Sequence, residues 1–199
     1  MNLFKNNQYG RSMVEMLGVL AIIGVLSVGG IAGYSKAMYK QKMNKTVDIV
    51  SKLLMGVNEW ASNNLGMANT LSKHSLAIKL GILDKSLCNN RDECTLPIGG
   101  KISVYFDTIE IDLTGISNPV NLCIDLLSHR WENALPGNSK YISAVTYMGG
   151  HKYIYSTRTD IGVKLEYTLA DIKNACDQAC NNNYGRCYIY FGMQLTHNT

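Results

Sequence analysis

Charged residues are scarce in this sequence. Only 17% of its 199 residues are Asp, Glu, Lys or Arg, compared with roughly 25% in ordinary soluble domains. The scarcity is uneven, because Glu15 is the only charged residue between Ser12 and Ser35. Proline is scarce as well, with three residues, which excludes a long proline-rich linker. This composition argues against an ordinary cytosolic globular protein.

Motifs of known enzymes are also missing. The sequence contains no GxSxG, HExxH, P-loop or GxGxxG pattern, so it indicates no nucleophile elbow, zinc-protease helix or nucleotide-binding loop. The net charge of +4 is mild, and the Lys and Arg residues after residue 64 are spread out. A contact with DNA therefore has no positive support. We expect no enzymatic activity and no cofactor.

One long apolar run is present near the N-terminus. Met16–Tyr34 comprises 19 residues without a charge, and a helix of that length spans about 28 Å, close to the hydrocarbon core of a bilayer. The run predicts a helix that spans a membrane. Basic residues flank it on both sides, so they do not fix its orientation; they are Lys5 and Arg11 before it and Lys36, Lys40, Lys42 and Lys45 after it.

Two common interpretations of this run leave features unexplained. A secretory signal peptide would have a cleavage site near Gly30-Ile31-Ala32, but its apolar region is normally roughly 7–15 residues long and carries no acid. A plain membrane anchor accommodates the length and leaves Glu15 without a role. A charged side chain inside a membrane costs roughly 2.5–3.5 kcal/mol on insertion scales, so it usually marks a partner or a function.

The residues around Glu15 resemble the type III signal of type IV prepilins. In that family a polar leader ends in Gly, cleavage follows this Gly, and the fifth residue of the mature chain is Glu. Here the leader MNLFKNNQYG ends at Gly10, which makes Arg11 the first mature residue and Glu15 the fifth. The resemblance is sharp over Gly10–Tyr34 and looser over the rest of the chain. Arg11 is a departure, because the family usually has Phe or another apolar residue at that position.

This resemblance implies a set of processing and assembly steps. A prepilin peptidase would cleave between Gly10 and Arg11, and the new terminus at Arg11 would be N-methylated. Glu15 of one subunit would pair with the Arg11 amine of a neighbour during assembly. The implied protein is a single-pass inner-membrane subunit that the pilus assembly machinery builds, together with further copies of itself, into an extracellular filament for adhesion, motility or DNA transfer.

The implied fold is α+β, with a long N-terminal helix on a small antiparallel sheet. We expect a cleaved leader at 1–10, a helix at 11–64 and a globular head domain at 65–199. Within the helix, residues 11–34 would span the membrane or form the filament core, and residues 35–64 would be amphipathic. The segment Pro119–Leu127 and the cysteine-rich end resemble type IVb pilins, including those of conjugative plasmids. A pseudopilin of a type II secretion system and an unprocessed, membrane-anchored binding module are the alternatives.

Hydrophobic periodicity predicts the remaining elements. The apolar stripe of the first helix continues through Met43, Val47, Val50, Leu53, Leu54, Val57, Trp60 and Ala61, so one helix is expected over Ser12–Asn63. Further along we expect a helix over Leu71–Leu83, and either a pair of strands over Lys101–Asp107 and Ile109–Leu113 or one bent strand. After these come a helix from Pro119 with an apolar face reaching Trp131 and a hairpin over Tyr141–Tyr147 and Lys152–Ser156. The last expected elements are a helix from a Thr168–Asp171 capping box to Cys180 and a strand over Arg186–Gly192.

The six cysteines predict disulfides rather than a metal site. They lack a CxxC pair, and the four histidines, His74, His129, His151 and His197, are scattered. Cys176 and Cys180 sit four residues apart on an expected helix, a spacing too wide for a bond. With Cys88–Cys94 as the simplest local bridge, two schemes remain: Cys123–Cys176 with Cys180–Cys187, or Cys123–Cys180 with Cys176–Cys187. Either scheme ties the last strand to the last helix, as in many pilins, and indicates an oxidising compartment.

Overall fold

Helix α1 (Met13–Asn63) is the longest element, with 51 residues. The computed structural model describes residues 13–63, 74–91, 93–105, 108–131, 140–147, 150–156, 165–166, 168–181 and 186–194. The chain divides into two units, Met1–Lys42 and Met43–Thr199, and α1 runs from the first into the second. The predicted helix is confirmed over Met13–Asn63, while Ser12 lies outside the described residues.

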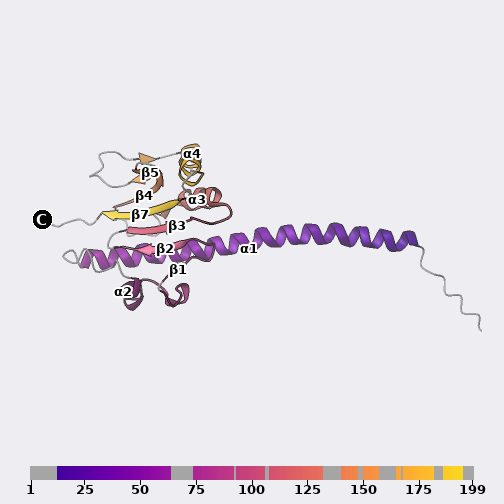
Figure 1. Cartoon of the computed structure of the whole chain (residues 1–199), viewed down its shortest axis with the longest axis horizontal. Helices are drawn as coiled ribbons and strands as arrows, with labels where there is room; N and C mark the ends of the chain where they lie inside the picture. Colours follow the sequence, from indigo (N-terminus) through magenta and orange to yellow (C-terminus); the bar gives the residue numbers. More distant parts are fainter. Residues whose placement is uncertain are drawn as a thin grey trace, which may run out of the picture. The chain divides into compact units, whose positions relative to one another are not determined.

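The second unit alternates short helices and strands (Figure 1). After α1 come α2 (His74–Lys79), the 3-10 helix η1 (Lys85–Leu87), β1 (Cys94–Thr95), β2 (Lys101–Val104), β3 (Thr108–Asp112), α3 (Pro119–Leu127), β4 (Lys140–Tyr147), β5 (Gly150–Ser156), β6 (Leu165–Glu166), α4 (Leu169–Cys180) and β7 (Tyr188–Gln194). The predicted α+β class is therefore confirmed.

The strands form one antiparallel sheet in the order β1-β2-β3-β7-β4-β5-β6. The last strand, β7, lies in the middle of this sheet, as Figure 1 shows in yellow. Its residue Ile189 pairs with Ile111 of β3 on one side and with Val145 of β4 on the other. The C-terminal strand thus joins two parts of the sheet that are distant in sequence.

One face of the sheet carries the core. Alternate residues of β2, β3 and β7 are buried, as the period of two in a strand requires; they are Ile102, Val104, Ile109, Ile111, Ile189 and Phe191. Helices α1, α3 and α4 contribute to the same cluster. Trp131 packs edge-on against Phe191 with ring centroids 5.2 Å apart, and its indole N–H donates to the Leu126 carbonyl at 2.8 Å. The large buried indole therefore has a hydrogen-bond partner.

Several predicted local features are confirmed. The capping box is present: the Asp171 N–H donates to Thr168 Oγ1 at 3.3 Å and the Thr168 N–H donates to Asp171 Oδ2 at 2.9 Å. Pro119 occupies the first turn of α3, where its missing N–H costs no hydrogen bond. Strands β4 and β5 form the expected hairpin, although β5 begins at Gly150, two residues before its predicted start.

Two predicted helices are wrong in extent. The helix expected over 71–83 ends at Lys79, with residues 71–73 outside the described part. Gly81 adopts a left-handed φ of 72°, and the Leu83 N–H donates back to the Ala77 carbonyl at 3.1 Å. Such a turn closes a helix because glycine takes this conformation without strain. Helix α3 ends at Leu127, so Trp131 lies beyond it rather than on its apolar face.

The strand predictions need smaller corrections. The first predicted pair becomes β2 and β3, which end at Val104 and Asp112, while Phe106 and Asp107 lie outside the described residues. The last strand is shifted by two residues, from the predicted Arg186–Gly192 to Tyr188–Gln194. The structure also adds β1, β6 and η1, which the sequence patterns do not indicate.

Candidate assembly helix and disulfide-linked head

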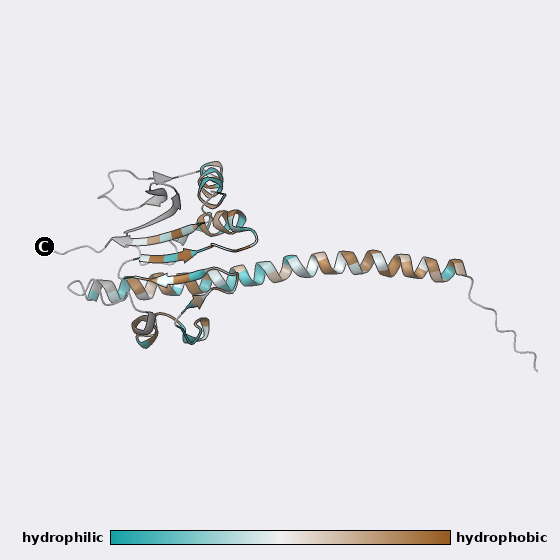
Figure 2. Cartoon of the chain, in the orientation of Figure 1, coloured by the Kyte–Doolittle hydropathy of each residue, from teal (hydrophilic) through white to brown (hydrophobic). Residues whose placement is uncertain are grey.

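The apolar half of α1, defined as residues 13–34, exposes large hydrophobic side chains throughout its length. Val14 is 75% exposed and Leu26 is 68% exposed. Figure 2 shows hydrophobic residues along this whole stretch of the helix. The exposed set comprises Met13, Val14, Met16, Leu17, Val19, Leu20, Ile22, Ile23, Val25, Leu26, Val28, Ile31 and Tyr34. A helix that is apolar on all sides is stable in a membrane or inside a larger protein assembly.

This stretch is also long enough to cross a membrane. By length and composition, α1 contains one candidate span near the N-terminus, and none of the most apolar window is buried within the chain. The 22 residues from Met13 to Tyr34 give a helix of about 33 Å at the standard rise. That length matches the hydrocarbon thickness of a typical bilayer.

Glu15 lies in the first turn of this helix. An acid at that place interacts favourably with the positive end of the helix dipole. Its side chain is exposed, and no residue in the described part of the chain pairs with its carboxylate. The predicted cleavage and methylation positions, Gly10 and Arg11, lie outside the described residues.

The docked half of α1, defined as residues 43–63, is covered by the head itself. Val50, Leu53, Leu54 and Val57 are buried in the common core, as the apolar stripe predicts. Met43, Val47 and Trp60 are partly buried against it.

Sequence reasoning missed Thr46 in this stretch. Thr46 is fully buried, and its Oγ1 accepts a hydrogen bond from the Ile98 N–H at 3.3 Å. Its spacing of four and seven residues from Val50 and Leu53 places it on the same helical face. The spacing therefore indicates a buried position, but an apolar pattern does not include a polar residue such as Thr46. Thr46 is the first buried residue along the described part of α1.

All six cysteines form disulfides: Cys88–Cys94, Cys123–Cys176 and Cys180–Cys187. The structure therefore has the first of the two schemes that the sequence leaves open. Cys123–Cys176 links α3 to α4, and Cys180–Cys187 links the end of α4 to the residue before β7. The two bonds therefore link α3, α4 and the start of the central strand β7.

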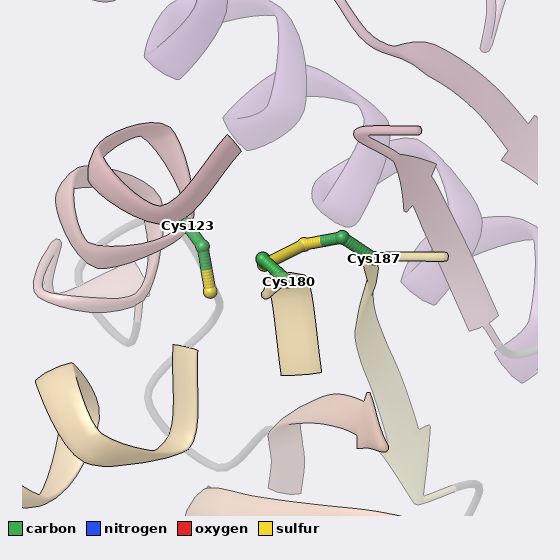
Figure 3. A group of neighbouring side chains, drawn as sticks. All are labelled: Cys123, Cys180 and Cys187. Carbon is green, nitrogen blue, oxygen red and sulfur yellow. A yellow bond between two sulfur atoms is a disulfide. The ribbon is translucent and has the colours of Figure 1, made fainter. Parts of the chain in front are cut away.

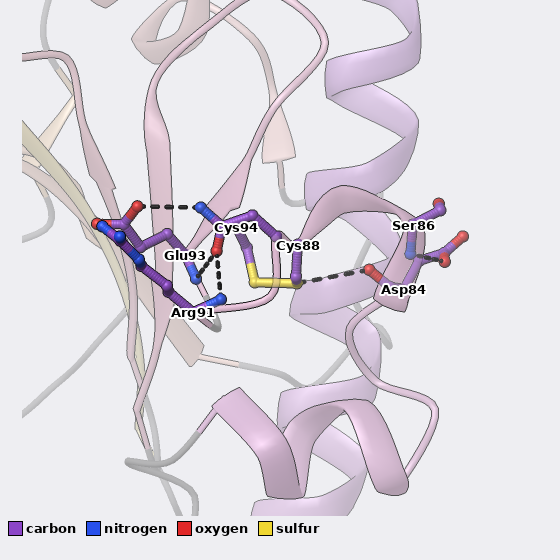
Figure 4. The surroundings of a disulfide bond; sticks show 7 residues. Asp84, Ser86, Cys88, Arg91, Glu93 and Cys94 are labelled. Atoms are coloured by element: carbon purple, nitrogen blue, oxygen red, sulfur yellow. Dashed lines mark hydrogen bonds between the residues drawn. A yellow bond between two sulfur atoms is a disulfide. The ribbon is translucent and has the colours of Figure 1, made fainter.

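The Cys88–Cys94 bond closes a polar loop that is ordered by its own side chains (Figure 4). Asn89 Oδ1 accepts hydrogen bonds from the N–H groups of Arg91 at 2.8 Å and Glu93 at 3.1 Å. The Glu93 carboxylate accepts from the Asn89 amide at 3.1 Å and from Lys101 Nζ at 3.4 Å. The Asn89 hydrogen bond, followed by the positive charge of Lys101, lowers the pKa of Glu93 below its ordinary value.

A second carboxylate stabilises the turn before this loop. Asp84 Oδ1 accepts a hydrogen bond from the Ser86 N–H at 2.8 Å and caps η1. This bond lowers the pKa of Asp84, and Lys52 of α1 contributes a smaller attraction. The charge of Lys52 in the docked half of α1 therefore acts on this turn.

A groove of about 780 Å³ lies between the docked half of α1 and residues 78–87. Its lining is partly apolar, with Ile49 and Trp60 on α1 and Ile78 on α2. Its charged residues have both signs, namely Lys52, Glu59, Asp84 and Lys85. This mixed rim selects no ligand charge, and its residues form no arrangement of nucleophile and base.

No known protein family, curated protein or solved structure matches this chain. The structure shows a long apolar N-terminal helix followed by an antiparallel sheet with three disulfides. This arrangement is compatible with a pilin-like shape.

Proposed function

We propose that this chain is a structural subunit of a type IV pilus. The observation that carries the proposal is the apolar half of α1, which has Glu15 in its first turn and is not covered by the described residues of the chain. Cleavage after Gly10 by a prepilin peptidase makes Glu15 the fifth residue of the mature chain. The subunit resides in the inner membrane before the assembly machinery transfers it into an extracellular filament.

The membrane stage follows from the length of the apolar half. A helix of about 33 Å spans the bilayer once, and the lysines at positions 36, 40 and 42 lie beyond its end, where their charges reach the polar interface. The three disulfides form and persist in an oxidising compartment. The head therefore belongs on the side of the membrane away from the cytoplasm.

The filament stage follows from the same surface. When the apolar half of α1 leaves the lipid, its hydrophobic surface must be buried again, and the apolar halves of neighbouring copies can bury it. In such surroundings the Glu15 carboxylate needs a cation. Cleavage supplies this cation as the α-amino group of Arg11 on a neighbouring subunit, four residues away in sequence number. The pair favours one register between subunits and penalises the others.

Substitution of Glu15 tests this proposal. The chain is expressed with its prepilin peptidase and assembly machinery, and filaments are sheared from the cells and quantified. The Glu15→Ala chain should be cleaved normally, but its filament yield should fall roughly tenfold or more. The substitution leaves the α-amino group of Arg11 as an unpaired buried charge, which costs about 3–5 kcal/mol. Glu59→Ala is the matched control, since Glu59 is an exposed acid in the docked half of the same helix. Wild-type filament yield from Glu15→Ala contradicts the proposal.

A further inference from the structure

Three sulfur atoms from three different elements converge in the head. The Sγ atoms of Cys123 on α3, Cys180 on α4 and Cys187 before β7 all lie within 4.8 Å of one another. The three residues are nearly inaccessible, with exposures of 0%, 8% and 1%. In Figure 3 the Cys123 side chain lies beside the Cys180–Cys187 disulfide, on the side of Cys180. Cys176, the partner of Cys123, is not a member of this group within the described residues.

We propose that Cys123 is a thiol–disulfide exchange site for the Cys180–Cys187 bond. When Cys123 is reduced, its thiolate attacks Cys180 Sγ and forms a Cys123–Cys180 bond. The Cys180–Cys187 bond breaks, and Cys187 leaves as a thiolate that takes up the proton lost by Cys123. One disulfide and one thiol are present before and after this step, so it needs no oxidant or reductant.

The exchange connects the two pairing schemes that the sequence allows. Cys180–Cys187 closes a separation of 7 residues, whereas Cys123–Cys176 closes one of 53. The shorter loop closes at the lower entropic cost, so the last intermediate of oxidation carries Cys180–Cys187 with Cys123 and Cys176 still reduced. A disulfide donor that oxidises these two thiols gives the observed scheme. When exchange precedes that oxidation, the same disulfide donor oxidises Cys176 and Cys187 instead, which gives Cys123–Cys180 with Cys176–Cys187.

Correct pairing therefore calls for a partner with a reactive thiolate, namely a thiol–disulfide oxidoreductase. Its thiolate attacks Cys180 Sγ of the wrong bond and releases Cys123. The freed Cys123 thiolate attacks Cys176 Sγ, forms Cys123–Cys176 and releases the Cys187 thiolate. Cys187 then displaces the partner from Cys180, which restores Cys180–Cys187 and the partner's thiolate. The partner attacks at Cys180 because this residue is more exposed than Cys123 and Cys187.

Two serine variants of the full-length chain test the role of Cys123. Cys176→Ser and Cys123→Ser both remove the same disulfide, but only Cys176→Ser leaves a thiol inside the sulfur group. Each variant is incubated at pH 8.5, where thiolates form, then acid-quenched, alkylated and digested. Tryptic cleavage at Lys173 and Arg186 separates Cys180 from Cys187. In Cys123→Ser, an additional cut before Asp177 separates Cys176 from Cys180.

The expected result is asymmetric. Cys176→Ser should carry the Cys123–Cys180 linkage in roughly one tenth or more of its molecules, because exchange between neighbouring sulfurs is reversible. Cys123→Ser should retain Cys180–Cys187 with Cys176 alkylated. Quantitative alkylation of Cys123 in the first variant, or equal scrambling in both variants, overturns the proposal.

Partial reduction of the wild-type chain provides a second route if either variant fails to fold. A limiting amount of a small thiol at pH 8.5 should yield species with the Cys123–Cys180 linkage, while Cys88–Cys94 stays unscrambled as an internal control. Exchange products that involve Cys88 or Cys94 as often as Cys180 contradict a specific site at Cys123.

Discussion

The two halves of α1 are both rich in hydrophobic residues, yet the described residues of the head cover only one of them. In the docked half, Leu53 and Val57 are buried against the head. In the apolar half, Leu20 and Leu26 are exposed, although they are equally hydrophobic. Figure 2 shows the same contrast: hydrophobic colours predominate in the apolar half, whereas hydrophilic and hydrophobic residues alternate in the later part of the helix.

The two patterns of hydrophobic residues suit one helix to two different surroundings. A stripe of apolar residues at three- and four-residue steps matches a single protein face, whereas an all-round apolar surface matches lipid or several neighbouring helices. The stripe in the docked half stabilises the head, and the all-round apolar surface of the apolar half stays exposed for lipid or for other helices. Hydrophobicity alone does not separate the two roles, but its periodicity does.

The largest expected effect comes from truncating a leucine in each half. Leu53→Ala should destabilise the head by about 2–5 kcal/mol, because it leaves a cavity in a packed core. Leu26→Ala should leave the unfolding free energy of the head unchanged and should weaken filament assembly. Urea unfolding of the full-length chain in mild detergent measures the first quantity. Equal destabilisation by both variants would contradict the claim that the head buries only the docked half.

Substitution of Thr46 tests where along α1 the packing against the head begins. Thr46→Val keeps the side-chain shape but removes the acceptor for the Ile98 N–H. A buried donor without a partner costs about 1–3 kcal/mol, so the head should unfold at a lower urea concentration. Thr46→Ser, which retains the hydroxyl, is the control and should lose less. If Thr46→Val is as stable as the wild-type chain, the packing boundary lies further along α1.

The smallest expected effect is a dependence of head stability on pH. Asp84 and Glu93 have folded-state pKa values below their ordinary values of 3.8 and 4.5. Their stabilising contribution is therefore present above the unfolded-state pKa values and is lost as the pH falls through the folded-state values. The urea midpoint should decrease modestly between pH 6 and pH 3. The double variant Asp84→Asn, Glu93→Gln should flatten this dependence, and an unchanged slope would argue against both contacts.

Local signals in the sequence predict much of the fold. The bounds of α1 follow from its uninterrupted periodicity, the start of α3 from Pro119, and the start of α4 from the Thr168–Asp171 capping box. Each of these features depends on residues within one or two helical turns. The early end of α2 is also local, since Gly81 closes it, but a lone glycine near the end of an apolar pattern does not reveal its φ.

Features that depend on distant residues could not be predicted. The central position of β7 arises from pairing with β3 and β4, which precede it by many residues. The choice between the two disulfide schemes depends on where α3 places Cys123 relative to α4, and spacing in the sequence carries no such information. The candidate assembly site is different, because Glu15 and its apolar helix are local, whereas any pairing with Arg11 involves a second copy of the chain.

The most direct measurement is N-terminal sequencing of the chain from sheared filaments. The account predicts a mature chain that begins at Arg11, with Glu15 as its fifth residue. A chain that begins at Met1 contradicts it, because an uncleaved leader leaves no α-amino group at Arg11 to pair with Glu15. A chain that begins at Gly33 contradicts it as well, because a secretory cleavage there removes the entire stretch proposed to form the filament core.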